Sequence, residues 1–83
     1  MKNVMEIQHA TEYKAIGLNV AYYRKMKGLT QLQLAELADI SRTHISNIEA
    51  IGMKTSVSLE VLFQIASALD IPVYKLFICP GDE

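Results

Sequence analysis

The chain has 83 residues, 51% of them hydrophobic, which is enough for the core of one small domain and not of two. Its single cysteine, Cys79, excludes an internal disulfide and a cysteine-based zinc site, and the absence of a leader or of an apolar run of roughly 20 residues predicts a cytoplasmic protein outside the membrane. The formal net charge of −1 argues against general polyanion binding, because Lys and Arg supply nonspecific affinity for phosphates.

The N-terminal part of the chain divides at about residue 12. Residues 1–12 show no clear apolar period and are expected to form a flexible arm or an extra helical turn. A first helix is predicted over residues 13–27, where apolar residues recur at helical spacing. These residues are Ile16, Val20 and Tyr23. Gly28 follows a cationic stretch, which is typical of a helix C-terminus.

Two short helices are predicted next, one over residues 31–38 and one that begins at Arg42. Thr30 is a good N-cap, and a glutamine three residues later completes a capping box. Ser41 is a second N-cap. Only Asp39 and Ile40 separate the first of these helices from the second cap, so the two helices should cross steeply, as in a helix-turn-helix.

The remainder of the chain predicts two more helices. Ser58 repeats the capping pattern and starts a fourth helix. Its expected inward residues are Leu59, Leu62, Ile65, Ala66 and Leu69. Pro72 is expected to open a short fifth helix that ends at about Phe77, because proline is tolerated in a first turn, and residues 79–83 form a tail.

No segment predicts a strand of comparable strength, so the expected class is all-α, a compact five-helix domain over residues 13–78. One core should bury apolar positions from the first four helices. The expected core residues are Ile16, Val20, Leu34, Ala35, Ile45, Ile48, Leu62, Ile65, Ala66 and Leu69.

Several short motifs in this order resemble the Cro and lambda-repressor-like helix-turn-helix family, of the xenobiotic-response-element type. They are Gly-Leu-Thr-Gln at 28–31, Leu-Ala at 34–35, Ile-Ser at 45–46, Glu49 and Ile-Ala-x-Ala-Leu at 65–69. The resemblance spans about residues 16–77. It implies a lambda-repressor-like DNA-binding domain that regulates transcription, most simply as a repressor, with the third helix in the major groove.

Two positions depart from the family pattern. Asp39 stands where the family usually has glycine, and aspartate tolerates the left-handed conformation better than most residues, so the turn should be kept. The loop 50–57 is about two residues longer than the family pattern.

The third helix supplies the candidate base-reading residues. With Ile45 and Ile48 turned inward, the helical period places Thr43 and Asn47 on the opposite face and leaves Arg42 free at the helix start. The resemblance assigns base reading to these three positions. Arginine can bind guanine, asparagine can bind adenine, and the threonine methyl group can contact thymine.

Other residues are candidates for positioning the domain on the DNA backbone. The resemblance places a phosphate contact at Gln31, where the start of a helix suits an anion, and Ser46 lies at the edge of the reading face. Lys27 and Lys54 are candidates on charge: residues 24–54 carry a net +2 and the rest of the chain carries −3. The resemblance also implies a structural pair. It joins Arg24 to Glu49.

No pattern for catalysis or for a metal site is present, because His9 and His44 lack neighbouring ligands and there is no glycine-rich phosphate loop. A non-enzymatic protein without cofactor, metal or small-molecule ligand is expected. Its expected partners are double-stranded DNA with a two-fold symmetric operator and a second copy of the chain, paired through the apolar segment 74–80.

The alternative is a protein-interaction module, such as an antitoxin or an anti-regulator. Leu32 and Leu37 exceed what the inward stripe of their helix needs, and together with the C-terminal apolar surface they could contact a partner. A negative electrostatic potential over the third helix would favour this alternative, and a positive strip from Gln31 to Lys54 would favour DNA.

Overall fold

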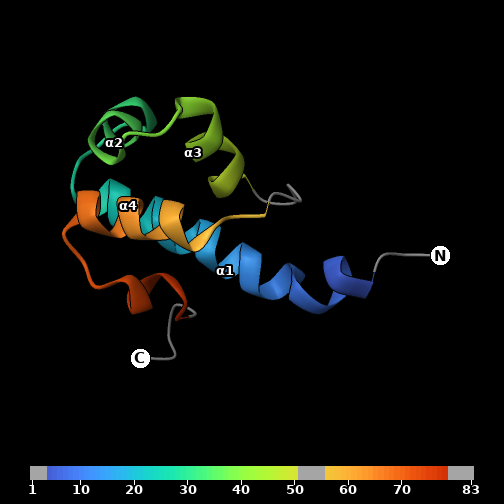
Figure 1. Ribbon diagram of the computed structural model, residues 1–83. Helices are drawn as coiled ribbons and strands as arrows, with labels where there is room; N and C mark the ends of the chain where they lie inside the picture. Colours follow the sequence, from blue (N-terminus) through green and yellow to red (C-terminus); the bar gives the residue numbers. More distant parts are fainter. Residues whose placement is uncertain (1–3, 51–55, 79–83) are drawn as a thin grey trace.

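The computed structural model describes the backbone of residues 4–50 and 56–78 (Figure 1). The elements are α1 (Val4–Met26), α2 (Gln31–Ala38), α3 (Arg42–Glu49), α4 (Leu59–Leu69) and the 3₁₀ helix η1 (Val73–Leu76). These ranges contain no strand, so the all-α expectation is confirmed. The fold differs from the expected five-helix count, because the fifth element is a single 3₁₀ turn.

The elements surround α1 and α4, which run through the middle of the molecule. Figure 1 shows α2 and α3 together on one side of this pair and η1 on the opposite side. The α1 helix contacts α3 on one flank and η1 on the other, while α4 packs on α2 and η1. The α2–α3 unit and η1 are therefore fixed to the same two helices from opposite directions.

One core lies between these elements. All ten predicted core residues are buried in it, so the helix phases are confirmed. Ala38 and Leu76 join them. Leu59, which was expected to face inward, is instead 61% exposed. It lies in the first turn of α4, one turn before Leu62, at the edge of the buried stripe, where no helix of the described residues covers it.

The three predicted N-caps are confirmed by their hydrogen bonds. The side-chain oxygens of Thr30, Ser41 and Ser58 each accept a backbone N–H from three residues later, at 3.0, 3.0 and 3.2 Å. In the α2 capping box the side chain of Gln33 also accepts the backbone N–H of Thr30. Local sequence therefore decides where α2, α3 and α4 begin.

The start of α1 differs from the expectation. The helix begins at Val4 instead of Tyr13, so residues 4–12 continue it by more than a single turn. No proline or glycine interrupts the chain between Val4 and Ile16, so the helical hydrogen bonds can propagate outward from the packed segment. Figure 1 shows this N-terminal part of α1 extending beyond the body of the domain.

The end of the described chain is held by a buried asparagine. Pro72 was expected inside the first turn of a helix, but it occupies the N-cap position of η1, with φ −67° and ψ 143°. Asn19 of α1 is 3% exposed, and its amide donates to the carbonyls of Leu76 and Ile78 at 3.0 and 2.6 Å. These bonds and the burial of Leu76 fix η1 against α1.

Candidate nucleic-acid interface

The turn between α2 and α3 is set by backbone hydrogen bonds. Asp39 has φ 59° and ψ 46°, the left-handed conformation in which this aspartate was expected to replace the usual glycine. The amides of Asp39 and Ile40 donate to the carbonyls of Glu36 and Ala35 at 3.3 and 3.0 Å. The chain therefore leaves α2 and enters α3 in a fixed direction, with Ile40 packed on the core.

The α3 helix separates its buried residues from its outward ones. Ile45 and Ile48 are buried, whereas Arg42 and Thr43 are exposed at the start of the helix and Asn47 is half-buried one turn later. Within the described residues, the helices that pack on α3 are α1 and α2, and both lie on its buried side. The first turn of α3 is thus accessible to a partner.

An ion pair connects α1 to the end of α3. The guanidinium of Arg24 donates from Nε to Oε2 of Glu49 at 2.7 Å and from Nη2 to Oε1 at 2.9 Å. Its Nη1 donates to the carbonyl of Leu29 at 2.8 Å. Both side chains are largely buried, with exposed fractions of 12% and 6%. The bidentate geometry fixes the distance between α1 and α3.

The same carboxylate also holds Gln31, the first residue of α2. The side-chain amide of Gln31 donates to Oε1 of Glu49 at 3.1 Å. Residues from α1, α2 and α3 therefore meet at one carboxylate, a convergence that sequence analysis did not anticipate. The pair Arg24–Glu49 came from the family resemblance, but the pattern gave no signal that Gln31 joins it.

The other phosphate candidates lie in different settings. Lys27 is exposed in the short turn between α1 and α2, where Gly28 has φ 71° and is free to adopt this left-handed conformation. Ser46 is half-buried in α3. Lys54 and residues 51–55 of the lengthened loop lie outside the described residues. Lys27 and Gln31 flank the capped start of α2, so a cation and a helix N-terminus are neighbours there.

Gly17 is a further positioning residue that sequence analysis missed. A Cβ atom at this position would collide with the backbone carbonyl oxygen of Ile48. The glycine therefore allows α3 to approach α1 closely enough for Arg24 to reach Glu49. A glycine inside an apolar helical pattern was the available signal, because such a residue lowers helix stability and usually has a packing reason.

The described residues contain neither a metal-ligand cluster nor a membrane-spanning helix. In residues 4–50 and 56–78, no group of three or more His, Cys, Asp or Glu side chains is placed to hold a metal ion. The helices of the same part of the chain include none with the length and apolar character that a membrane crossing needs.

Comparison with known proteins shows that the chain is similar to helix-turn-helix proteins. A helix-turn-helix family model matches residues 20–76. The chain is similar to the HTH-type transcriptional regulator SinR of Bacillus subtilis (strain 168), with 34% identity over 61 residues, or 74% of this chain and 54% of SinR. It therefore spans about half the length of that regulator.

A control protein and a restriction-modification controller protein are also similar to this chain. Control protein C.SmaI of Serratia marcescens is 38% identical over 63 residues, which cover 76% of this chain and 73% of C.SmaI. The crystal structure of the restriction-modification controller protein C.AhdI from Aeromonas hydrophila superposes with a TM-score of 0.74 at 33% identity, and the match covers 81% of this chain and 98% of C.AhdI.

Proposed function

The chain belongs to the helix-turn-helix family of the Cro and lambda-repressor type, and from this premise we propose that it is a transcriptional regulator that binds a specific sequence of double-stranded DNA. The observation that carries the proposal is the fixed α2–α3 unit. Its turn, its caps and the Arg24–Glu49 pair hold α3 with an accessible first turn, as a recognition helix must be held to enter the major groove.

In this proposal the outward side chains of α3 read bases. Arg42 binds guanine through its two donors, Asn47 binds adenine, and Thr43 contacts a thymine methyl group. Gln31, Ser46, Lys27 and Lys54 contact phosphates and position the domain without reading sequence. The hydrogen bond from Gln31 to Glu49 supports a positioning role for Gln31, because the carboxylate holds its side-chain amide in one orientation at the start of α2.

We propose further that the protein acts as a homodimer on a two-fold symmetric operator, most simply as a repressor that occludes a promoter in the cytoplasm. It performs no chemical step. One domain contacts only a few base pairs, so two copies supply the specificity that a genome demands. The similarity to transcriptional and control proteins supports regulation by binding.

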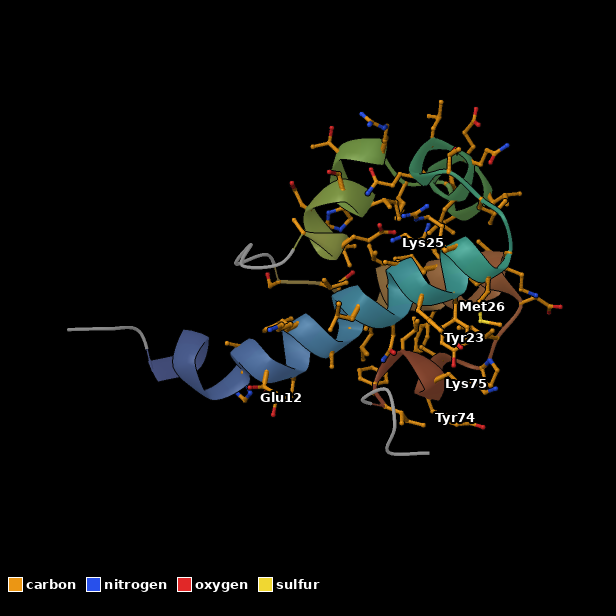
Figure 2. The ribbon with its side chains drawn as sticks, turned by 180° about the vertical axis from the view of Figure 1, so that it is seen from behind. Glu12, Tyr23, Lys25, Met26, Tyr74 and Lys75 are labelled. Atoms are coloured by element: carbon orange, nitrogen blue, oxygen red, sulfur yellow. The ribbon has the colours of Figure 1, made fainter. Side chains whose placement is uncertain are left out.

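The proposed dimer surface differs from the sequence-based one, which was the apolar segment 74–80 alone. Leu76 belongs to the protein's own core and cannot take part, because it is completely buried. Tyr74 in η1 and Phe77 directly after it are about half exposed. Figure 2 shows Tyr74 and Lys75 next to the end of α1 that carries Tyr23 and Met26. The proposed seam therefore combines η1 with the C-terminal half of α1.

Selection of bound duplexes from random DNA tests this function. The expected product is one motif with two inverted half-sites about 10 base pairs apart, to which the protein binds much more tightly than to a scrambled duplex. Failure to enrich any motif would contradict sequence-specific binding. Sedimentation of the protein alone and with the selected duplex tests the dimer, and a monomer under both conditions would remove it.

A further inference from the structure

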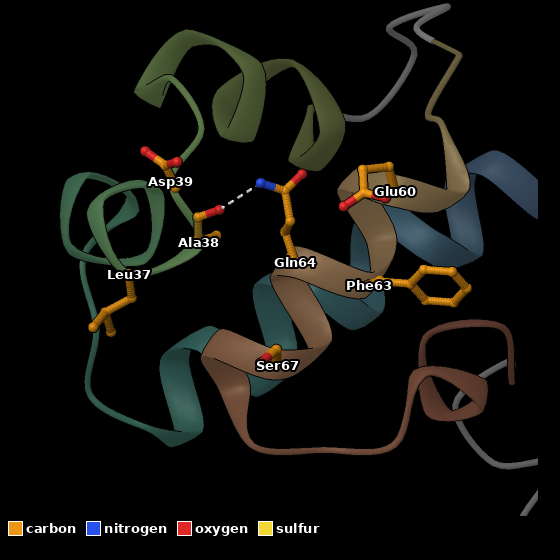
Figure 3. Close-up of a pocket in the computed structure, with 7 residues that line it drawn as sticks. All are labelled: Leu37, Ala38, Asp39, Glu60, Phe63, Gln64 and Ser67. Carbon is orange, nitrogen blue, oxygen red and sulfur yellow. Dashed lines mark hydrogen bonds between the residues drawn. The ribbon is translucent and has the colours of Figure 1, made fainter.

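A shallow hollow of about 370 Å³, wide open to solvent, lies between the end of α2 and the outer side of α4, on residues that the proposed DNA contacts do not use. Figure 3 shows its lining. Leu37 and Phe63 lie at opposite sides of it, Ser67 lies between them, and two carboxylates, Asp39 and Glu60, lie along a third edge. The hollow therefore has an apolar part and an acidic part.

The apolar part consists of side chains that the core does not need. Leu37 is 61% exposed and Phe63 is 50% exposed, and they come from different helices. Single exposed apolar side chains are ordinary, but two of them from different helices that line one hollow favour an interaction surface.

The acidic edge offers hydrogen-bond acceptors. Gln64 lies between the two carboxylates, and its amide nitrogen donates to the carbonyl of Ala38 at 3.1 Å. This bond turns the amide oxygen of Gln64 toward the side of Glu60 (Figure 3). No lysine or arginine lines the hollow in the described part of the chain. Arg42 follows Asp39 by three residues, yet among the described residues the two form no ion pair.

We propose that this hollow binds a short amphipathic segment of a partner protein that carries a large apolar side chain next to Lys or Arg. The apolar side chain lies between Leu37 and Phe63, and the cation contacts Asp39 and Glu60. A positive partner follows from charge complementarity, since two carboxylates and an amide oxygen can accept hydrogen bonds from ammonium or guanidinium groups. The same carboxylates repel phosphates, so nucleic acid is not the occupant.

A titration without DNA tests the proposal independently of the proposed regulator function. The probe is a capped synthetic peptide of about 12 residues, roughly three helical turns, with Leu and Phe on one face and Lys on the other. In ¹H–¹⁵N spectra of the full 83-residue chain, the amide shifts are expected to concentrate at residues 37–39 and 60–67. A peptide with Glu in place of Lys is expected to cause none of them.

Matched variants decide whether the carboxylates of the hollow are responsible. Asp39 and Asp70 both end a helix in the left-handed conformation, with φ 59° and 56°, which asparagine also tolerates. Asp39→Asn combined with Glu60→Gln is expected to weaken peptide binding about tenfold, since each exposed ion pair contributes modestly. Asp70→Asn combined with Glu12→Gln removes the same charge elsewhere and is expected to leave the affinity nearly unchanged.

Three results would overturn the proposal. The first is equal weakening by both double variants, which would indicate attraction to net charge alone. The second is unchanged binding by Phe63→Ser, an exposed position whose replacement leaves the core intact. The third is the same set of amide shifts on raising the protein concentration without peptide, which would identify a second copy of the chain as the occupant.

Discussion

Two polar side chains of α1, Arg24 and Asn19, hold opposite sides of the molecule by different means. Arg24 fixes the α2–α3 side through a bidentate ion pair with Glu49. Asn19 fixes η1 by donating its neutral amide to two backbone carbonyls. The difference teaches which long-range contacts a sequence can reveal: a complementary pair of side chains leaves a pattern, whereas a backbone carbonyl is present at every residue and leaves none.

The largest expected effect follows from removing the ion pair between Arg24 and Glu49. Arg24→Ala leaves the buried Glu49 carboxylate without its cation, and the free energy of unfolding should fall by about 3 kcal/mol. Lys25→Ala removes the same charge from an exposed neighbour and should change it by less than about 0.5 kcal/mol. Urea denaturation followed by circular dichroism measures both, and equal losses would show that the ion pair is not structural.

Removing the neutral hydrogen bonds of Asn19 should lower the free energy of unfolding by less than removing the ion pair does, but by a measurable amount. Asn19→Ala leaves the carbonyls of Leu76 and Ile78 without their donor, at an expected cost of about 1 to 3 kcal/mol in unfolding free energy. Gln64→Ala also removes an amide that donates to a backbone carbonyl, but from a half-buried position, so its cost should be smaller. Faster amide exchange at Lys75 and Phe77 in the Asn19 variant would locate the loss at η1.

The third prediction concerns the proposed DNA contacts on the α2–α3 side of the molecule, which the ion pair holds in place. Arg42→Ala or Asn47→Ala should cost about 1 to 3 kcal/mol of binding free energy on the selected duplex and little on a scrambled one. Lys27→Ala should weaken both duplexes and reduce the salt slope by about one unit. Fluorescence anisotropy across a salt series measures all three variants. Parental affinity of the Arg42 and Asn47 variants for the selected duplex would exclude α3 as the reading helix.

The smallest expected effects on the free energy of unfolding come from removing the N-caps of two different helices. Ser41→Ala and Ser58→Ala should each lower the unfolding free energy by about 1 kcal/mol, because each exposed hydroxyl accepts one backbone N–H. Thermal melts of both variants check this. A much larger loss for Ser41→Ala would indicate that the α3 cap is coupled to the Arg24–Glu49 pair, which would make the α2–α3 side a single cooperative unit.

The candidate site also has one part that the sequence predicted and one part that it did not. The accessible start of α3 follows from the phase of Ile45 and Ile48, so sequence alone was enough to orient Arg42 and Thr43 outward. The contact between Gln31 and Glu49 could not be predicted, because it joins residues that are 18 positions apart and lie on two different helices. The roles of these residues toward DNA stay predictions.

The sequence by itself determined where α2, α3 and α4 begin and which of their faces is buried. A cap acts over three residues and an apolar stripe repeats within one helix, so both depend on neighbours along the chain. Only the tertiary structure decided that Leu59 is exposed and Leu76 buried, and that Asn19 holds η1. Periodicity gives the direction of a side chain, but burial requires another element to cover it, and that element is brought there by the rest of the fold.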